Sequence, residues 1–424
     1  MKSEIIAPGV RQVTVPDDRF QTVRIAAHFA VPLRAETAAE YALLPRLLTR
    51  CCADYPEDLA FSRRLAMLYG AGVSGTAQVI GETQQISVSV GLLDDRFVPQ
   101  DEPILPACAR LLCQMLFDPV LEGGTFRAAD LAEEKRRLAE EIRAERNDLR
   151  TLALQQARRL MFAEEPYGLD RQGTAEQVEA LTAERVTAAW RRMLRTAQVT
   201  ILLVGTADPA GVIAPIRAAM AQIPRAPIPV DAPSVHVPSA PRTVTEPVAA
   251  LQSKLVMGFS TPVRAPQETM PMRLGVALYG GTATSRLFLN VRERLSLCYY
   301  CAARYDRIKG FMVVDSGIQS ENAERAQAEI LRQLDELKAG RFSDDELEAA
   351  RLSMLDQLGT VSDSPAALDS WYAGQLYTSL QTPSEMARTA ASVTRAEVVA
   401  ALQTLRPELT YLLDGRAGKE GTAE

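Results

Sequence analysis

The chain has 424 residues, of which 47% are hydrophobic and 24% are charged, a composition typical of a globular protein with two or more domains. Its net charge of -6 argues against a phosphate-backbone binder, which usually carries a basic face, so no nucleic acid is expected as a partner. The two histidines, His28 and His236, are too few for a histidine-rich metal site.

The cysteine content and the N-terminus indicate a cellular compartment. Six cysteines in 424 residues are too few for a secreted disulfide scaffold. No apolar export signal and no membrane-spanning run are visible, so we expect a cytoplasmic protein without membrane association. Cys298 and Cys301 form a C-x-x-C pair. Strand residues three apart point to opposite faces, so core packing is favoured over a zinc or redox role.

Periodic apolar residues predict strands and long amphipathic helices along the chain. Strands interspersed with helices in this way predict an α+β sandwich, in which helices cover one face of a sheet. The predicted strands include 22–31, 84–91, 254–260 and 310–317, and the predicted helices are 127–162, 177–195, 321–339 and 344–358.

A proline-rich segment divides the chain. Residues 224–241 contain six prolines, which exclude a helix or a central strand and predict a semi-rigid linker. The predicted domains are therefore an N-terminal domain (1–223), a linker (224–244) and a C-terminal domain (245–424). His236 lies inside this linker, and we expect it to be solvated.

The two halves repeat each other. A threonine placed to cap a helix precedes a final strand in each half: Thr182 with residues 199–205, and Thr394 with residues 409–415. Self-similarity over such a long period indicates duplication of one α/β unit. Upstream, Phe126, Leu131 and Lys135 match Phe342, Leu347 and Arg351 at identical spacing.

A charged helical segment carries the first family resemblance. Residues 134–142 read Glu-Lys-Arg-Arg-Leu-Ala-Glu-Glu-Ile, which by themselves predict a solvated helix with i,i+4 ion pairs. The segment resembles the M16 metallopeptidases, the group of pitrilysin, insulin-degrading enzyme and mitochondrial processing peptidase. In catalytic members the glutamate that matches Glu141 completes the zinc site. Residues 278–294, with Leu297 and Tyr299, resemble a second family segment.

The resemblance covers both halves in order. It implies two homologous α/β sandwich halves of the M16 type, joined by the proline-rich linker. Catalytic members carry H-x-x-E-H on an early helix; aligned on Tyr55-Pro56, the matching positions here are Ala42, Pro45 and Arg46. Alanine cannot bind zinc, proline cannot act as a base, and arginine repels a cation. Zinc needs about three protein ligands, so we expect a degenerate site without zinc and a chain inactive alone.

The second half retains another family feature. Arg292 and Tyr299 match a pair that, in the family, contacts the substrate backbone and stabilises the reaction centre; both can donate hydrogen bonds to an oxyanion. The alternative is that Arg292 pairs with Glu293 while Tyr299 fills the core. Ser296 stands where relatives commonly have glycine.

The resemblance implies a function with one open alternative. The chain would be the non-catalytic subunit of a two-chain zinc peptidase, supplying Arg292 and Tyr299 to a chamber shared with a zinc-bearing M16 paralogue, with a peptide as substrate. The alternative is a structural or peptide-binding M16-fold protein, for example a homodimer, without a peptidase role. Among small bacterial members, the resemblance points to a subgroup linked to elongation factor P modification.

Overall fold

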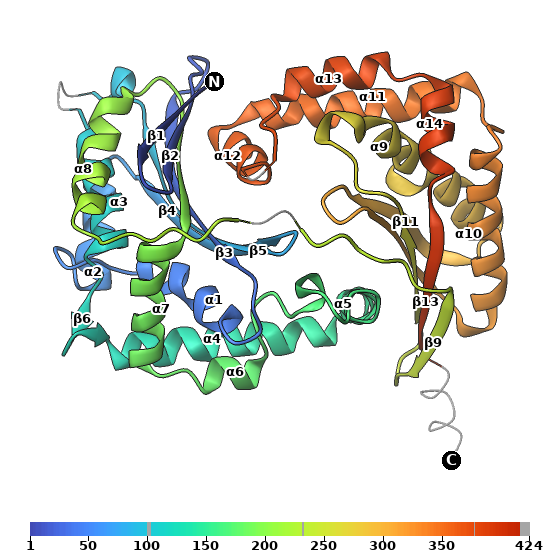
Figure 1. Ribbon diagram of the computed structural model, residues 1–424, viewed down its shortest axis with the longest axis horizontal. Helices are drawn as coiled ribbons and strands as arrows, with labels where there is room; N and C mark the ends of the chain where they lie inside the picture. Colours follow the sequence, from blue (N-terminus) through green and yellow to red (C-terminus); the bar gives the residue numbers. More distant parts are fainter. Residues whose placement is uncertain (100–102, 231–232, 377, 416–424) are drawn as a thin grey trace. The chain divides into compact units, whose positions relative to one another are not determined.

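A computed structural model describes residues 1–99, 103–230, 233–376 and 378–415 (Figure 1). Its sheets and helices confirm the predicted α+β class. No helix in these ranges is long and apolar enough to cross a membrane. The chain forms two compact units, and each unit includes a segment from the other half of the chain. The predicted domain boundaries remain a prediction. Unit 1 comprises residues 1–144, 169–232 and 361–380, and unit 2 comprises residues 145–168, 233–360 and 381–424.

Unit 1 contains a six-stranded sheet in the order β1-β2-β8-β3-β5-β4. The two central strands, β3 and β8, are antiparallel, whereas β2 and β8 are parallel. The strands are β1 (Lys2–Ala7), β2 (Val10–Val15), β3 (Thr22–Pro32), β4 (Gly72–Ile80), β5 (Thr83–Leu93) and β8 (Gln198–Val204), with a small hairpin of β6 (Leu121–Glu122) and β7 (Thr125–Phe126). The helices are α1 (Ala38–Leu48), α2 (Asp58–Met67), α3 (Leu105–Phe117), α4 (Ala128–Asn147), α6 (Ala175–Glu179), α7 (Ala183–Thr196) and α8 (Pro209–Ala221).

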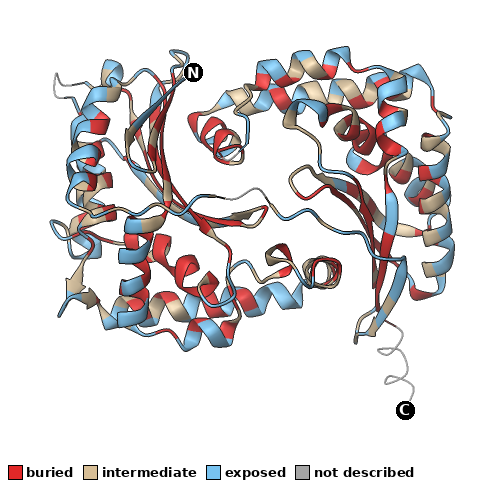
Figure 2. Ribbon diagram, viewed as in Figure 1, coloured by how far each residue is buried: buried red, intermediate tan, exposed pale blue. Residues whose placement is uncertain are grey.

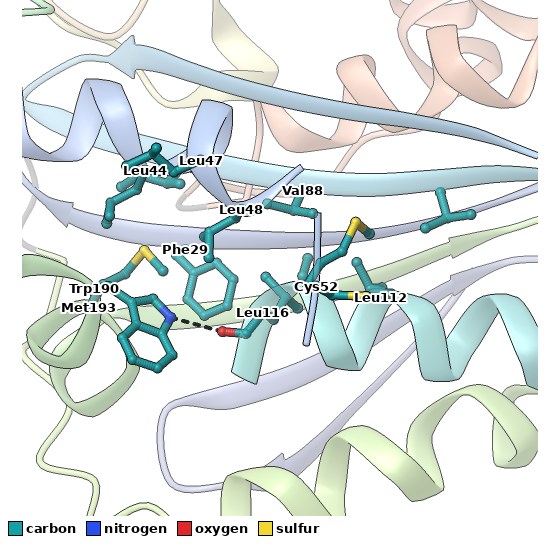
Figure 3. Close-up of a cluster of buried hydrophobic side chains, with 14 of the residues drawn as sticks. Phe29, Leu44, Leu47, Leu48, Cys52, Val88, Leu112, Leu116, Trp190 and Met193 are labelled. Carbon is teal, nitrogen blue, oxygen red and sulfur yellow. Dashed lines mark hydrogen bonds between the residues drawn. The ribbon is translucent and has the colours of Figure 1, made fainter. Parts of the chain in front are cut away.

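The main core of unit 1 lies between one face of this sheet and its helices. Figure 3 shows Phe29 and Val88 of the sheet packed among apolar side chains of α1, α3 and α7. The Trp190 indole N–H donates to the Leu116 carbonyl oxygen at 2.9 Å, which satisfies the one polar atom of this large ring. Within the unit, buried residues follow the strands and the helix faces that cover them (Figure 2).

A single helix from the C-terminal half covers the other face of this sheet. Helix α12 (Pro365–Ala373) packs against β3 and β8. Its carboxylate, Asp369, is buried and accepts hydrogen bonds from Arg24 at 2.6 Å and from His28 Nε2 at 2.8 Å. His28 Nδ1 in turn lies 2.8 Å from the Ser87 hydroxyl. His28 is thus a residue on a strand face, as the sequence predicts, and it fixes α12 to the sheet.

Unit 2 contains a five-stranded sheet in the order β11-β12-β10-β13-β9. Helix α5 (Leu149–Met161), from the N-terminal half, packs against β10 and β13, so each unit takes one helix from the other half. The strands are β9 (Arg242–Pro247), β10 (Ser253–Ser260), β11 (Cys298–Asp306), β12 (Phe311–Ile318) and β13 (Arg406–Asp414), and the helices are α9 (Met270–Val276), α10 (Ala323–Lys338), α11 (Asp344–Thr360), α13 (Pro383–Ser392) and α14 (Arg395–Leu402).

The contacts of the repeated residues match between the units. Lys135 donates to the Leu181 carbonyl oxygen at 2.6 Å, and its counterpart Arg351 donates to the Val393 carbonyl oxygen at 3.0 Å. Each carbonyl belongs to the residue before a capping threonine, and both threonines accept a backbone N–H three residues on. In both copies, therefore, a cationic side chain donates to the carbonyl oxygen of the residue that precedes the helix N-cap.

Two helices that the sequence predicts as continuous are each divided into two shorter helices. The predicted helix 127–162 is two helices, α4 and α5, because Asp148 is extended and its carboxylate accepts the Arg150 N–H as a new N-cap. The predicted helix 177–195 is likewise split into α6 and α7 by the extended cap Thr182. Amphipathic periodicity continues across both breaks, which is why periodicity alone did not find them.

The expectation that His236 is solvated is wrong. Its ring is buried in unit 2, 4.6 Å from the Phe162 ring centre. Nδ1 lies 2.5 Å from Glu165, and Nε2 lies 3.0 Å from Glu408. Lys309, fully buried, also contacts Glu165 at 2.5 Å. Two cations and two carboxylates therefore neutralise each other where the linker crosses the unit.

We expect Asp369→Ala to lower the free energy of unfolding of unit 1 by about 3 kcal/mol, because it leaves the buried His28 and the half-buried Arg24 without their carboxylate. Urea unfolding followed by tryptophan fluorescence measures this directly, since both tryptophans, Trp190 and Trp371, belong to unit 1. The exposed Asp363→Ala is the matched control, with an expected change of about 0.5 kcal/mol or less. Equal effects of the two substitutions would show that α12 is held without this ion pair.

His236 makes the stability of unit 2 depend on pH. The hydrogen bond to Glu408 raises the pKa of His236, burial opposes this, and Glu165 adds to the increase. A histidine whose pKa is raised on folding stabilises the fold fully below its ordinary pKa of about 6.5, and this contribution disappears as the pH rises through the folded pKa. The stability difference between the wild type and His236→Gln should therefore shrink above pH 6.5. Imidazole NMR of the two histidines measures the titration, and a His236 pKa below about 6.5 would contradict this account.

Candidate functional site

The positions that align with the zinc motif line a cleft of unit 1. This cleft has a volume of about 730 Å³ and lies between α1, α2, α4 and the edge strand β4. Ala42, Pro45 and Arg46 all contribute to its wall. The other lining residues are Thr49, Arg50, Asp58, Phe61, Ser62, Leu65, Val73, Gly75, Thr76, Ala77, Glu133, Glu134, Arg137 and Gln172.

The base position of the motif is only a backbone feature here. Pro45 lies inside α1 and has no N–H to donate. Its carbonyl oxygen accepts the Thr49 hydroxyl at 2.7 Å. A Cβ atom on Gly75 would lie 2.4 Å from the same oxygen, so only glycine lets β4 pass this close to α1. No proton-accepting side chain is available at this position.

Arg46 occupies the last position of the motif and is ion-paired. Its guanidinium forms a two-pronged contact with the Glu141 carboxylate, one bond of which measures 3.1 Å. A Glu134 oxygen lies 3.8 Å from the same Nη1 nitrogen. Glu134 and Glu141 are seven residues apart on α4, so two helical turns place both carboxylates on one face. The structure thus brings together the predicted positions Arg46 and Glu141, and adds Glu134.

A second cation extends this network. Arg50, one turn after Arg46, contacts Glu133 at 2.6 Å, Asp130 at 3.2 Å and Glu134 at 3.4 Å. Sequence reasoning missed Arg50 and Glu134. Helical spacing could have predicted both residues. Arg50 follows Arg46 by four residues and Glu134 precedes Glu141 by seven, so each lies on the same helix face as its partner.

These residues do not fit a zinc ion. No imidazole lies in the cleft: His28 is on the sheet face covered by α12, and His236 belongs to unit 2. In the described ranges, no three His, Cys, Asp or Glu side chains are grouped to hold a metal ion. The carboxylates that are present already neutralise Arg46 and Arg50. Zinc would have to displace a cation that is covalently part of the chain, and it would gain only oxygen ligands.

The structure also contains a buried serine–histidine–aspartate series, Ser87–His28–Asp369, in unit 1. The relative exposures of these residues are 8%, 2% and 4%. They lie between the sheet and α12, where a substrate cannot reach the serine oxygen. These hydrogen bonds hold α12 against the sheet.

Arg292 and Tyr299 lie at the start of the edge strand of unit 2. Arg292 is on a π-helical segment (Leu287–Arg294), with its guanidinium 4.7 Å from the Phe288 ring centre and 3.4 Å from Glu293. Tyr299 is on β11 and is 54% exposed, so it does not fill the core. The substrate-binding role of both residues stays a prediction. Each side chain is accessible to a ligand from solvent.

The loop between them has a strained backbone. Ser296 adopts a positive φ of 48°, a conformation that costs a non-glycine residue about 1–2 kcal/mol. The glycine expected at this position in relatives would adopt it freely. Ser296 therefore adopts the left-handed backbone conformation of this turn although glycine is the residue that favours it.

A β-bulge changes the orientation of the C-x-x-C pair. The register of β11 against β12 shifts between Cys298 and Tyr300, which reverses the alternation of side chains. The Cys301 thiol consequently hydrogen-bonds to the Cys298 sulfur, which lowers the pKa of Cys298 and raises that of Cys301. The expectation that the two thiols point to opposite faces is wrong, because the strand is not regular there.

Arg46, at the position that aligns with the last histidine of the zinc motif, is held in an internal ion pair. Residues 180–354 match the family model described as the peptidase M16 inactive domain. A Bacillus subtilis protein described as a probable inactive metalloprotease, YmfF, is 27% identical over 412 residues, with 97% of each chain covered. By these matches the chain is similar to inactive metalloprotease-like members of the M16 peptidase family.

Solved structures agree with this assignment. A conserved protein from Enterococcus faecalis superposes with a TM-score of 0.87 at 25% identity, covering 98% of both chains. A peptidase M16 inactive domain from Pseudomonas fluorescens superposes with a TM-score of 0.79 at 17% identity, covering 97% of this chain and 98% of that chain. These likenesses support the predicted M16-type fold in both halves.

The two carboxylates that contact Arg46 should differ in their contribution to stability. Glu134 is buried and lies within 4 Å of three guanidiniums, those of Arg46, Arg50 and Arg137, so Glu134→Ala should lower the free energy of unfolding by about 2–3 kcal/mol. Glu141 is half exposed, so Glu141→Ala should cost about 1 kcal/mol or less. Tryptophan fluorescence during urea unfolding measures both. A larger loss for Glu141→Ala would contradict the geometry.

Proposed function

We propose that this chain is the non-catalytic subunit of a two-chain M16-type peptidase, in which a paralogue with intact H-x-x-E-H supplies the zinc. One observation carries the proposal. The motif position Arg46 is neutralised by Glu141 and Glu134 within the chain, while Arg292 and Tyr299 are left accessible. The cleft that aligns with the zinc motif contains an internal ion pair, whereas the two residues that would bind a substrate are accessible to solvent.

The edge strand of unit 1 supports the binding of a peptide. Strand β4 is the last strand of its sheet, so one row of its backbone N–H and C=O groups has no partner strand. An extended peptide can add to such an edge through main-chain hydrogen bonds. The cleft lies beside this strand, with Val73, Gly75, Thr76 and Ala77 in its wall. The acidic and basic groups of the cleft would contact alternate side chains of the peptide.

Arg292 and Tyr299 fit the role of contributed residues. A guanidinium and a phenol hydroxyl can both donate to the oxygen that becomes negative during peptide hydrolysis. Neither side chain is held in a strong internal ion pair, because Arg292 meets only its sequence neighbour Glu293 at 3.4 Å in the described ranges. A substrate carbonyl could replace this contact at low cost.

The test is reconstitution with a zinc-bearing M16 paralogue from the same genome. The pair should cleave a fluorogenic peptide, and neither chain alone should do so. Arg292→Ala should lower kcat of the pair about 100-fold, the usual effect of removing one oxyanion donor, without changing assembly measured by analytical ultracentrifugation. The matched control is Arg294→Ala, two residues away and more exposed, which should leave kcat unchanged.

Unchanged turnover with Arg292→Ala would refute the shared site. A second candidate function, peptide binding without a peptidase role, rests on the edge strand β4 and its cleft. A homodimer that binds an extended peptide, but forms no active pair, would support this alternative. Fluorescence anisotropy of a labelled peptide tests binding to the strand edge, because proline substitutions along the peptide would weaken it; the activity of the reconstituted pair distinguishes the two functions.

A further inference from the structure

A group of arginines surrounds one tyrosine at the end of β11 in unit 2. Tyr305 pairs with Met312 in the β11–β12 register. Paired residues share a face of the sheet, and Met312 is fully buried. Ala303, two residues earlier on the same face, lies beside Gly280 of the segment that follows α9. Tyr305 therefore points to the layer of α9, which packs against β11.

Three arginines reach this position from separate segments. Arg273 is on α9, and its Nη1 lies 3.7 Å from the Met386 sulfur of α13. Arg264 follows β10, where the Thr261 N–H donates to the Gly310 carbonyl at 2.8 Å and so holds the chain on the β11–β12 turn. Arg307 lies in that turn. The charges of Arg264, Arg273 and Arg307 all act on the Tyr305 hydroxyl.

Several polar atoms of this group have no protein partner. The Tyr305 hydroxyl and the Arg264 Nε are both buried and make no hydrogen bond, and the nearest polar contact of the Arg273 guanidinium is a thioether. Buried donors without partners cost about 1–3 kcal/mol each. Burial and the neighbouring Arg307 lower the pKa of Arg273 to about 10. The three arginines, all half-buried, carry like charges, and a compensating negative group near them would lower their mutual repulsion.

The nearby acid does not supply that group. Asp306 accepts the Tyr167 hydroxyl at 2.6 Å and the backbone N–H groups of Ile308 and Lys309. Its carboxylate is therefore already used in the turn and beside α5. In the described ranges, no ion pair is formed by Arg264 or Arg273.

We propose that Arg264, Arg273 and Tyr305, with Arg307 beside them, bind a phosphate group. Guanidinium forks match the oxygens of a phosphate, and a tyrosine hydroxyl adds a further donor. The several positive charges favour a dianion over a singly charged carboxylate. The ligand is inorganic phosphate or a small phosphomonoester. This site is independent of the function proposed above and involves neither Arg292 nor the cleft of unit 1.

The test is isothermal titration of the wild-type protein with inorganic phosphate, with glycerol 3-phosphate and with acetate, in a chloride buffer of constant ionic strength. Saturable binding of phosphate or of the monoester, with acetate at least tenfold weaker, is expected. Tighter binding of the monoester would identify an organic phosphate as the source, and tighter binding of phosphate would identify the free ion. No heat of binding for either phosphate compound would overturn the proposal.

Variants separate a ligand site from a structural one. Arg273→Met should abolish the phosphate-dependent rise in Tm and at the same time raise Tm without phosphate, because it removes a buried charge that Arg307 repels. Tyr305→Phe should weaken phosphate binding and raise Tm without phosphate, because it removes a buried hydroxyl that has no partner. The exposed Arg325→Gln is the charge-matched control and should bind as the wild type does. If Arg273→Met lowers Tm and leaves phosphate binding intact, Arg273 is structural and the proposal is wrong.

Discussion

The guanidinium of Arg46 lies against two carboxylates of α4, and the charge balance of the unit 1 cleft depends on this contact. A guanidinium between two carboxylates satisfies the same electrostatic demand as a metal cation, since Glu134 and Glu141 would otherwise repel each other on one face of α4. It cannot activate water, because it has no open coordination position and does not lose its proton. The charges of the cleft are therefore balanced within the chain, and Arg50 extends the same network.

A second kind of charge pairing lies on the sheet faces that α12 and α5 cover. Each unit covers one face of its sheet with its own helices and the other face with a single helix from the other half of the chain. In unit 1 the carboxylate of Asp369 on α12 meets Arg24 and His28 of the sheet. In unit 2, α5 contributes Arg150, which contacts the buried Asp315 at 2.5 Å. Exchanged helices thus carry buried ion pairs, and such pairs specify a unique docking position because a misplaced helix would leave a charge unpaired.

The two units differ in what they leave unsatisfied. In the cleft of unit 1 the functional positions are neutralised internally, whereas unit 2 exposes Arg292 and Tyr299 and keeps buried donors of Arg264 and Tyr305 without partners. A duplicated fold in which one copy has closed its site, while the other presents free donors, is consistent with a protein that binds rather than cuts. This contrast supports the proposed role beside a catalytic partner.

The sequence by itself predicted the α+β class and the duplicated capped helices, because these depend on residue identity and local spacing. It also predicted that Arg46 and Glu141 belong to one site. Only the tertiary structure decided which partners neutralise Arg46, the exchange of α5 and α12, the burial of His236 and the bulge that joins Cys298 to Cys301. Each of these rests on contacts between segments far apart in the chain, and periodicity carries no information about them.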